Sequence, residues 1–341
     1  MFKMNFVVAL GLLLVSLWGC ASTSSVAPEW VTNPDGVYDS DVYLWAVGSG
    51  SNRKIAENDA LSLLVRSIQQ TVASTTEASK KVAGNDAEGF AVDYDFAGQV
   101  ATASSIKDVP GVSFPQSWVA GNGTVYMLAL LNREEAGRFY RQKISDLSAV
   151  VESELLFASS NEGTFEALAA LRAAATAAGE QQGYIDMLAG IHPDLYRIVS
   201  LDYVSVPAVE ALERRHQEKI QIAVEVAGDS NGRVAAILEG VLTDNGLKVA
   251  KGAAAKSARY LLQGTVVMEP RKNDSKYHYV RFVANVNLHD LNAGKTLFPY
   301  SKNGREAHVT HEEAVQRAYR TIENTLRKEF VPQLWDFLQA R

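Results

Sequence analysis

The sequence contains a single cysteine, Cys20, among its 341 residues. A lone cysteine cannot form an internal disulfide. A strong excess of either charge is also missing, because 33 lysines and arginines stand against 39 aspartates and glutamates and neither sign clusters strongly. This mildly acidic balance gives no electrostatic footprint for nucleic acid or for anionic lipid, and we expect no nucleic-acid partner.

Long apolar runs are missing as well, apart from one near the N-terminus. Lys3 precedes an apolar run from Phe6 to Val15. About 20 apolar residues are needed to cross a hydrocarbon core, so this run is short for a permanent membrane span. One early charge, a short apolar run and small residues after it predict a secretory signal that is removed on export.

The run ends in Leu17-Trp18-Gly19-Cys20, which resembles a bacterial lipobox, with Trp18 where a small residue is usual. The resemblance implies that the signal peptide at 1–19 is removed and that Cys20 becomes the lipidated, palmitate-bearing first residue. The alternatives, a reactive thiol or a buried cysteine that only fills space in the core, fit poorly with the position of Cys20 at the end of the apolar run. The acylated cysteine would hold the chain at a lipid bilayer, and the small residues of 20–27 predict a flexible tether.

A strand and a long helix are predicted after the tether. β-branched and aromatic residues predict the strand at 42–48, ending in a glycine-containing loop. Apolar residues at three- and four-residue spacing then predict a helix from Arg53 to about Ser79. Ser51 or Asn52 can cap its first turn.

An antiparallel hairpin is predicted further along the chain. Residues 81–95 have no regular period and predict a loop, after which strand signals resume at 99–107. Two more strands, at 113–119 and 124–131, flank the turn Gly121-Asn122-Gly123. Asn-Gly between β-forming residues is a strong hairpin signal.

The chain from Asn132 to Ile191 is predicted to be helical and is rich in alanine. Asn132, followed by Glu135, has the pattern of a capping box. Gly179 and Gly183 are expected to break the run. The block is interpreted as a connector between two α+β units.

The last part of the chain predicts a second α+β unit. Its elements are expected to be a strand at 220–226, a helix ending at Asn245-Gly246, a strand at 247–250, a short helical turn near Ala254, strands at 260–268, 278–291 and 295–301, and a final helix from His311. A strand, a helix and a strand, followed by three strands and a helix, favour a helix-covered sheet.

These patterns predict an α+β fold in which two small antiparallel sheets packed with helices are joined by an alanine-rich helical segment. The expected segments are the signal at 1–19, the tether at 20–27, a first α+β domain at 28–140, a helical connector at 141–217 and a second α+β domain at 218–341.

The first domain resembles the LPP-twenty lipoprotein family. The resemblance rests on Pro28-Glu29-Trp30, on Trp45-Ala46-Val47-Gly48 and on Ala56 with Ala60. It covers about 28–140 and implies a bacterial envelope domain with a strand leading into a long helix on an antiparallel sheet. Leu64 stands where members often have a small residue. The C-terminal part is similar in layout to domains of flagellar-motility lipoproteins, secretion lipoproteins and lipoprotein activators of cell-wall synthases.

Three patterns could carry ligand or metal chemistry. Gly48 to Lys54 lies between a strand and a helix, but it lacks the spacing of a phosphate loop or a dinucleotide fingerprint and is interpreted as a capped turn. Gly228 to Arg233 is polar enough for an ion, yet it lacks the ligand register of a calcium loop. His308 and His311 have a spacing that would suit two zinc ligands on one helix. However, Thr310 is typical of a helix cap and Glu313 of a first turn, so an ordinary helix start is expected here, with His308 outside the helix.

No pattern supports catalysis, a cofactor or a metal site, so a non-enzyme is expected, with Cys20 as the one residue whose chemistry is assigned. A group of aromatic residues in the first domain is interpreted mainly as core and sheet packing, with a binding face as the alternative: Trp30, Tyr38, Tyr43, Trp45 and Trp118.

The expected function is that of an anchored binding or assembly module whose partners are envelope proteins or the cell wall. Ala21 is unlike the acidic residue that retains many lipoproteins at the inner membrane, which favours the outer membrane. The alternatives are a structural part of a flagellar, secretion or cell-wall-synthesis complex, and an enzyme whose site has no recognisable motif.

Overall fold

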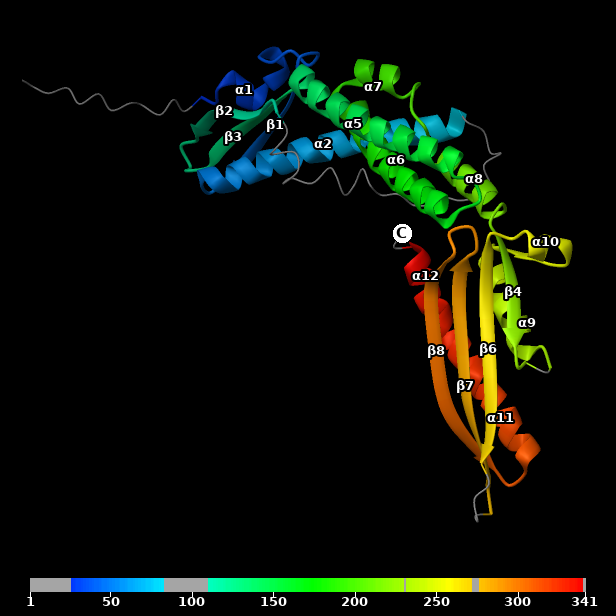
Figure 1. Ribbon diagram of the computed structural model, residues 1–341. Coiled ribbons are helices and arrows are strands. Elements are labelled where there is room, and N and C mark those ends of the chain that lie inside the picture. The colour runs from blue at the N-terminus through cyan, green and yellow to red at the C-terminus, as the bar shows by residue number, and fades with distance from the viewer. Residues whose placement is uncertain (1–25, 83–109, 230, 272–275, 340–341) are drawn as a thin grey trace, which may run out of the picture. The chain divides into compact units, whose positions relative to one another are not determined.

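The computed structural model describes residues 26–82, 110–229, 231–271 and 276–339 (Figure 1). The fold is α+β and divides into two compact units. The first unit contains the described elements up to Phe139 together with Ala189–Pro193, and the second contains Tyr140–Leu188 and the chain from Asp194 onward. The signal, Cys20, most of the tether and the strand predicted at 99–107 lie outside the described residues.

The first unit has a three-stranded antiparallel sheet. Its strands are β1 (Tyr43–Gly50), β2 (Val112–Val119) and β3 (Val125–Asn132), in the order β1-β3-β2. The predicted hairpin is confirmed, because β2 and β3 pair from Val119 and Val125 outward. Two short helices, α1 (Glu29–Thr32) and η1 (Pro34–Gly36), precede β1.

The helix α2 (Arg53–Val82) packs on this sheet. Asn52 caps it, since the Asn52 side-chain oxygen accepts a hydrogen bond of 3.0 Å from the amide of Ile55. The helix continues through residues 81 and 82, which were predicted to begin a loop. The strand β1 also runs two residues past its predicted end, because Ser49 pairs with Tyr126 and Gly50 with Val125.

The next helices are α5 (Arg133–Ser160), α6 (Phe165–Ile191), α7 (Pro193–Val199) and α8 (Val206–Gln217). The predicted cap is confirmed: the side-chain oxygen of Asn132 accepts from the amide of Glu135 at 2.9 Å. The predicted break at Gly179 and Gly183 is wrong. Both glycines lie buried within α6, where packing outweighs a cost of about 1 kcal/mol per glycine.

The second unit contains a five-stranded sheet, with the order β5-β4-β6-β7-β8. Its strands are β4 (Gln221–Ala227), β5 (Lys248–Ala250), β6 (Tyr260–Arg271), β7 (His278–Asp290) and β8 (Lys295–His308). Its helices are α9 (Arg233–Asp244), α10 (Ala253–Lys256), α11 (His311–Thr325) and α12 (Val331–Gln339), with the π-helical turn η2 (Leu326–Phe330) between the last two.

This sheet is mixed, which corrects the expected antiparallel arrangement. The strand β4 is parallel to both β5 and β6, whereas β6, β7 and β8 are antiparallel. The cause is the two helical connections, since α9 lies between β4 and β5 and α10 lies between β5 and β6. Each connection carries the chain back to the edge where the previous strand began, so the next strand runs in the same direction. The strand β8 also extends to His308, seven residues past its predicted end, since its residues from Phe298 to His308 pair continuously with β7.

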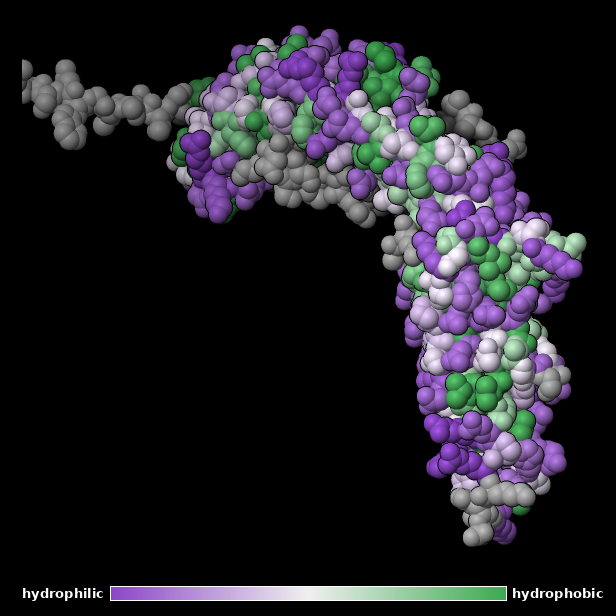
Figure 2. Space-filling view, in the orientation of Figure 1, coloured by the Kyte–Doolittle hydropathy of each residue, from purple (hydrophilic) through white to green (hydrophobic). Residues whose placement is uncertain are grey.

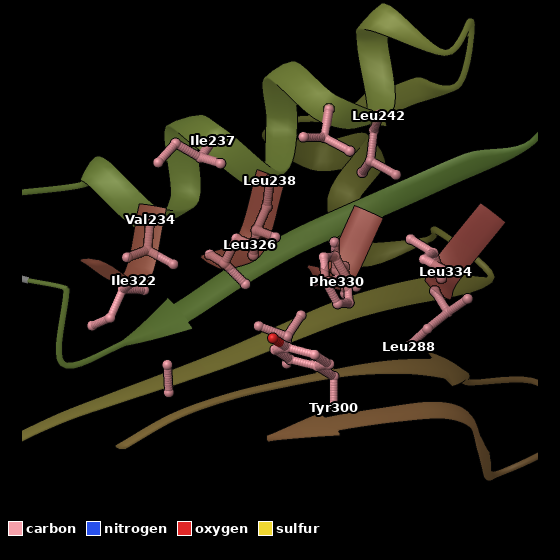
Figure 3. Close-up of a cluster of buried hydrophobic side chains, with 14 of the residues drawn as sticks. Val234, Ile237, Leu238, Leu242, Leu288, Tyr300, Ile322, Leu326, Phe330 and Leu334 are labelled. Carbon is pink, nitrogen blue, oxygen red and sulfur yellow. The ribbon is translucent and has the colours of Figure 1, made fainter. Parts of the chain in front are cut away.

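The helices α9, α11 and α12 cover one face of the sheet and enclose the main core (Figure 3). Phe330 is fully buried at its centre, with its ring centroid 5.3 Å from that of Tyr300. Along β7, alternate residues from Val280 to Leu288 are buried in this core. The residues between them must therefore point to the opposite face of the sheet.

Candidate functional site

The opposite face of β6, β7 and β8 carries exposed or half-exposed side chains, and we call it the uncovered face. Figure 2, in the orientation of Figure 1, shows a mainly hydrophilic surface over these strands. The strand register places polar and charged residues in rows across it: Gln263, Thr265 and Glu269 on β6, Arg281, Asn285 and Asn287 on β7, and Ser301, Asn303 and Arg305 on β8. This composition is suited to recognition of a polar partner rather than to burial in a core.

Three arginines gather at one end of the uncovered face, and we call them the arginine cluster: Arg271, Arg281 and Arg305. Together with Tyr279 and Asn303 they line a depression of about 360 Å³. Register places Arg281 directly opposite Arg305, and the Arg305 guanidinium carbon lies 5.3 Å from the centre of the Tyr279 ring. Gly304 also lines the depression, and an added Cβ at this position would clash with the ring of Phe282.

The arginine cluster is electrostatically unbalanced. Within the described part of the chain, none of its arginines forms a salt bridge. Register places one carboxylate, Glu269, beside Arg281, so three positive charges and one negative charge give a net charge of +2. Like charges directly opposite each other on neighbouring strands are destabilising, so this arrangement favours a bound anion over an empty surface. Guanidinium groups bind carboxylates and phosphates through paired hydrogen bonds.

The glycines of the loop Gly48 to Lys54 serve packing. A Cβ on Gly48 would lie 2.5 Å from the Ala56 carbonyl oxygen and 2.6 Å from the Ala60 Cα, so β1 and α2 touch through their backbones here. The Ser49 amide donates to Asp59 at 2.8 Å, and Asn52 caps the helix. A capped turn, as interpreted from the sequence, accounts for these residues.

The loop Gly228 to Arg233 is built around Asp229. Its carboxylate accepts hydrogen bonds from the amides of Arg233, Val234 and Ala235, at 3.1, 2.8 and 3.0 Å. These are the amides that an anion at the start of α9 would need. Arg233 in turn pairs with Glu323 at 2.6 Å. The loop is thus an occupied helix cap.

The two histidines of the zinc-like pattern lie on different elements. His308 ends β8 and pairs in register with His278, whereas His311 begins α11. Thr310 caps that helix by accepting from the Glu313 amide, as predicted. Among the residues that the structure describes, no group of three or more His, Cys, Asp or Glu side chains could hold a metal ion. None of the described helices is both long and apolar enough to cross a membrane.

The five aromatics of the first unit separate into two classes. Trp30 is 5% exposed and belongs to the core. The other four are half-buried, with Tyr38 against Tyr43 at 6.1 Å between ring centroids and Trp118 against Tyr126 at 5.4 Å. The Gln116 amide donates to the Tyr38 hydroxyl at 2.7 Å. Packing against the sheet accounts for Tyr38, which precedes β1, and for Tyr43 within it, while Trp118 and Tyr126 keep part of their rings accessible.

Sequence reasoning missed the arginine cluster. The alternation of polar and apolar residues from His278 to Asp290 was sufficient to assign Arg281 to the solvent face of a strand. The contributions of Arg271 and Arg305 depend on the registers of two strand pairs, which the alternation does not fix.

No protein-family model matches the chain, and the search of curated proteins also finds no match. Among solved structures, the chain is similar to a minor lipoprotein from Acinetobacter baumannii, with 16% identity, a TM-score of 0.25 and coverage of 33% of this chain and 88% of that one. It is similar to the secreted protein HP1454 of Helicobacter pylori, with 14% identity, a TM-score of 0.35 and coverage of 65% and 78%. It is also similar to lipoprotein GNA1162 of Neisseria meningitidis, with 18% identity, a TM-score of 0.25 and coverage of 34% and 98%. At such TM-scores these bacterial proteins do not define the fold or function of this chain, and its resemblance to the LPP-twenty family rests on its residues.

Proposed function

We propose that the chain is a bacterial envelope lipoprotein, anchored through acylated Cys20 at the outer membrane, that acts as a non-enzymatic binding module. The signal layout of 1–19 and the lipobox-like sequence before Cys20 support the anchor. The tether at 20–27 then gives the folded units freedom to reach a partner near the membrane.

The observation that carries the binding role is the arginine cluster on the uncovered face. Its net positive charge selects a partner of the opposite sign, and the Val267–Val283 register pair beside it offers a small apolar contact. We propose that the partner is an acidic, extended segment of another envelope protein. A segment with two or more carboxylates could pair with the arginines while it lies along the rows of amide and hydroxyl side chains.

Charge reversal in the cluster tests this binding role. With the purified full chain in detergent and a fluorescent peptide of glutamate and leucine residues, Arg281→Glu should weaken binding by about tenfold or more, because it replaces attraction by repulsion. Fluorescence anisotropy measures the Kd at low and high salt. Binding by the unsubstituted chain should weaken as salt rises.

The matched control is Lys256→Glu on α10, which makes the same change in charge at an exposed lysine that precedes β6, whereas Arg271 ends that strand. It should change the Kd by less than about twofold. Equal losses of affinity for both variants would show that binding depends only on the overall charge of the protein, and would contradict the assignment of the binding surface to the arginine cluster.

The anchor has its own test. Cys20→Ser removes the thiol that receives the lipid, so cells expressing this variant should lose all labelling of the protein by an alkyne-tagged palmitate analogue. Ser24→Ala, in the same tether, should keep full labelling. Persistent labelling of the serine variant would refute the anchor and would leave the arginine cluster unaffected, because the two rest on separate observations.

A further inference from the structure

A second cavity, of about 230 Å³, lies within the second unit and is independent of the uncovered face. It is lined by α5, by α6 and by the connection between α7 and α8. Its lining includes Ser148, Val151 and Glu152 on α5, Gln181 on α6, and Asp202 with Tyr203 on the connection. Pockets for drug-sized ligands span about 300 to 1,000 Å³, so this cavity is suited to a smaller molecule.

Gln181 is the central feature of the cavity. It is 1% exposed, and its amide nitrogen donates to the Ser148 hydroxyl at 2.5 Å and towards the Ile144 carbonyl oxygen at 3.4 Å. The Ile144 carbonyl oxygen can only accept a hydrogen bond, so the side-chain nitrogen of Gln181, and not its oxygen, must face it. The side-chain oxygen is left buried without a hydrogen-bond partner among the described residues. A buried polar atom in this state costs free energy until a donor reaches it.

The charges around the cavity favour a donor that is positively charged. Glu152 and Asp202 line it, and no lysine, arginine or histidine is among its described lining residues. Burial raises the pKa of Tyr203, and the nearby carboxyl of Asp186 raises it further. Burial also raises the pKa of Asp186, against the effect of a hydrogen bond from Gln182. The described residues that line the cavity therefore include two carboxylates and no cationic side chain.

We infer that this cavity binds a primary ammonium group carried on a short aliphatic chain. An ammonium N–H would donate to the free Gln181 oxygen, and Glu152 with Asp202 would balance its charge. The aliphatic carbons would lie against Val151 and Val204, which also line the cavity. A free amine and the side chain of a lysine in a partner protein share this chemistry.

The test uses n-butylammonium and the purified full chain in detergent, with binding followed by ligand-observed NMR. Saturable binding with a Kd of about 1 mM is expected for so small a ligand. Gln181→Met keeps the length of the side chain and removes the oxygen, so it should weaken binding by about tenfold. The neutral analogue 1-butanol should not show saturable binding, because it has a single donor and no charge.

Two variants that each remove one negative charge distinguish binding in the cavity from an effect of overall charge. Asp202→Asn should weaken binding of n-butylammonium by about threefold or more, whereas Glu180→Gln, at an exposed carboxylate next to Gln181 in sequence, should leave it unchanged. The thermal midpoint of Gln181→Met should stay close to that of the unsubstituted chain, since removal of the unpaired buried oxygen offsets loss of the hydrogen bond to Ser148, and an unchanged midpoint shows that lost binding is not lost folding.

A comparison with Nα-acetyl-lysine methylamide identifies the source of the ammonium group. Binding at least as tight as that of n-butylammonium supports a lysine side chain of a partner, and exclusion of the larger molecule supports a free amine. Equal binding of butanol and n-butylammonium would show that the cavity does not recognise the charge, and unchanged binding after Gln181→Met would show that it does not use the Gln181 oxygen; either result would overturn the inference. Neither result depends on the arginine cluster.

Discussion

Replacing Gly48 by valine should unfold the first unit. At this position β1 and α2 approach so closely that any side chain would enter the backbone of the helix: an added Cβ would lie 2.5 Å from the Ala56 oxygen and 2.6 Å from the Ala60 Cα. Overpacking costs about 1–3 kcal/mol where side chains can move, and here the obstacle is backbone, so we expect a loss of about 3 kcal/mol or more. Hydrogen exchange followed by mass spectrometry should show full loss of protection in β1 and α2.

The control for this substitution is Gly121→Ala. Gly121 lies in the hairpin turn between β2 and β3, with nothing within 4 Å of an added Cβ among the described residues. The alanine variant should keep its protection and its stability within about 0.5 kcal/mol. If Gly48→Val behaved in the same way, the close contact between β1 and α2 would be refuted.

The second large effect is expected at the Arg259–Asp290 ion pair. Asp290, at the end of β7, is 1% exposed, and it accepts hydrogen bonds from the Arg259 guanidinium at 2.9 and 3.2 Å and from the Ala293 amide at 2.9 Å. Arg259→Met leaves the carboxylate buried without its cation. We expect a loss of about 3–5 kcal/mol in the free energy of unfolding of the second unit at neutral pH, measured by urea denaturation.

The loss should depend on pH in a defined direction. Burial alone would raise the pKa of Asp290, but the hydrogen bonds from Arg259 and Ala293 outweigh it and hold the pKa below its ordinary value. A lowered pKa stabilises the fold above the pKa of the unfolded chain, about 3.9, and this contribution disappears as the pH falls through the folded value. The difference between Arg259→Met and the unsubstituted chain should therefore shrink below about pH 4.

An exposed ion pair supplies the comparison. Arg320 and Glu313 form a salt bridge on α11, with 54% and 39% of their side chains exposed. Arg320→Met should cost less than about 1 kcal/mol, because solvent screens exposed pairs. The double variant Arg259→Met with Asp290→Asn should recover part of the loss, since no buried charge remains. A cost for Arg259→Met as small as that for Arg320→Met would contradict the role of burial.

Local signals predicted the helix starts well. Asn52, Asn132 and Thr310 each cap a helix at the position expected, because a cap requires only one side chain and an amide two or three residues further on. The ends of strands and the directions in which strands pair were harder to predict from the sequence. The extension of β8 to His308 and the parallel pairing of β4 follow from contacts between distant segments, which local propensity does not encode.

The same limit applies to the candidate sites. Gln181, Ser148 and Tyr203 come together only because α5, α6 and the connection before α8 pack against one another. Their spacing in the sequence matches no motif. The anchor at Cys20 is the opposite case, since export and acylation are read from a linear segment, but that segment lies outside the described residues.

The first unit is formed by separate segments of the chain, and its folding must therefore follow the order in which those segments emerge. Arg133 donates to the Ile191 carbonyl oxygen at 2.6 Å, and Gly190 lies so close to Ile68 that an added Cβ would be 2.9 Å from the Ile68 carbonyl oxygen. During vectorial emergence from a ribosome or an export channel, these partners arrive only after all of α5 and nearly all of α6. The strands β1, β2 and β3 and the helix α2 therefore cannot complete their packing until about 50 residues beyond Phe139 have emerged, and a chaperone could shield them during that interval.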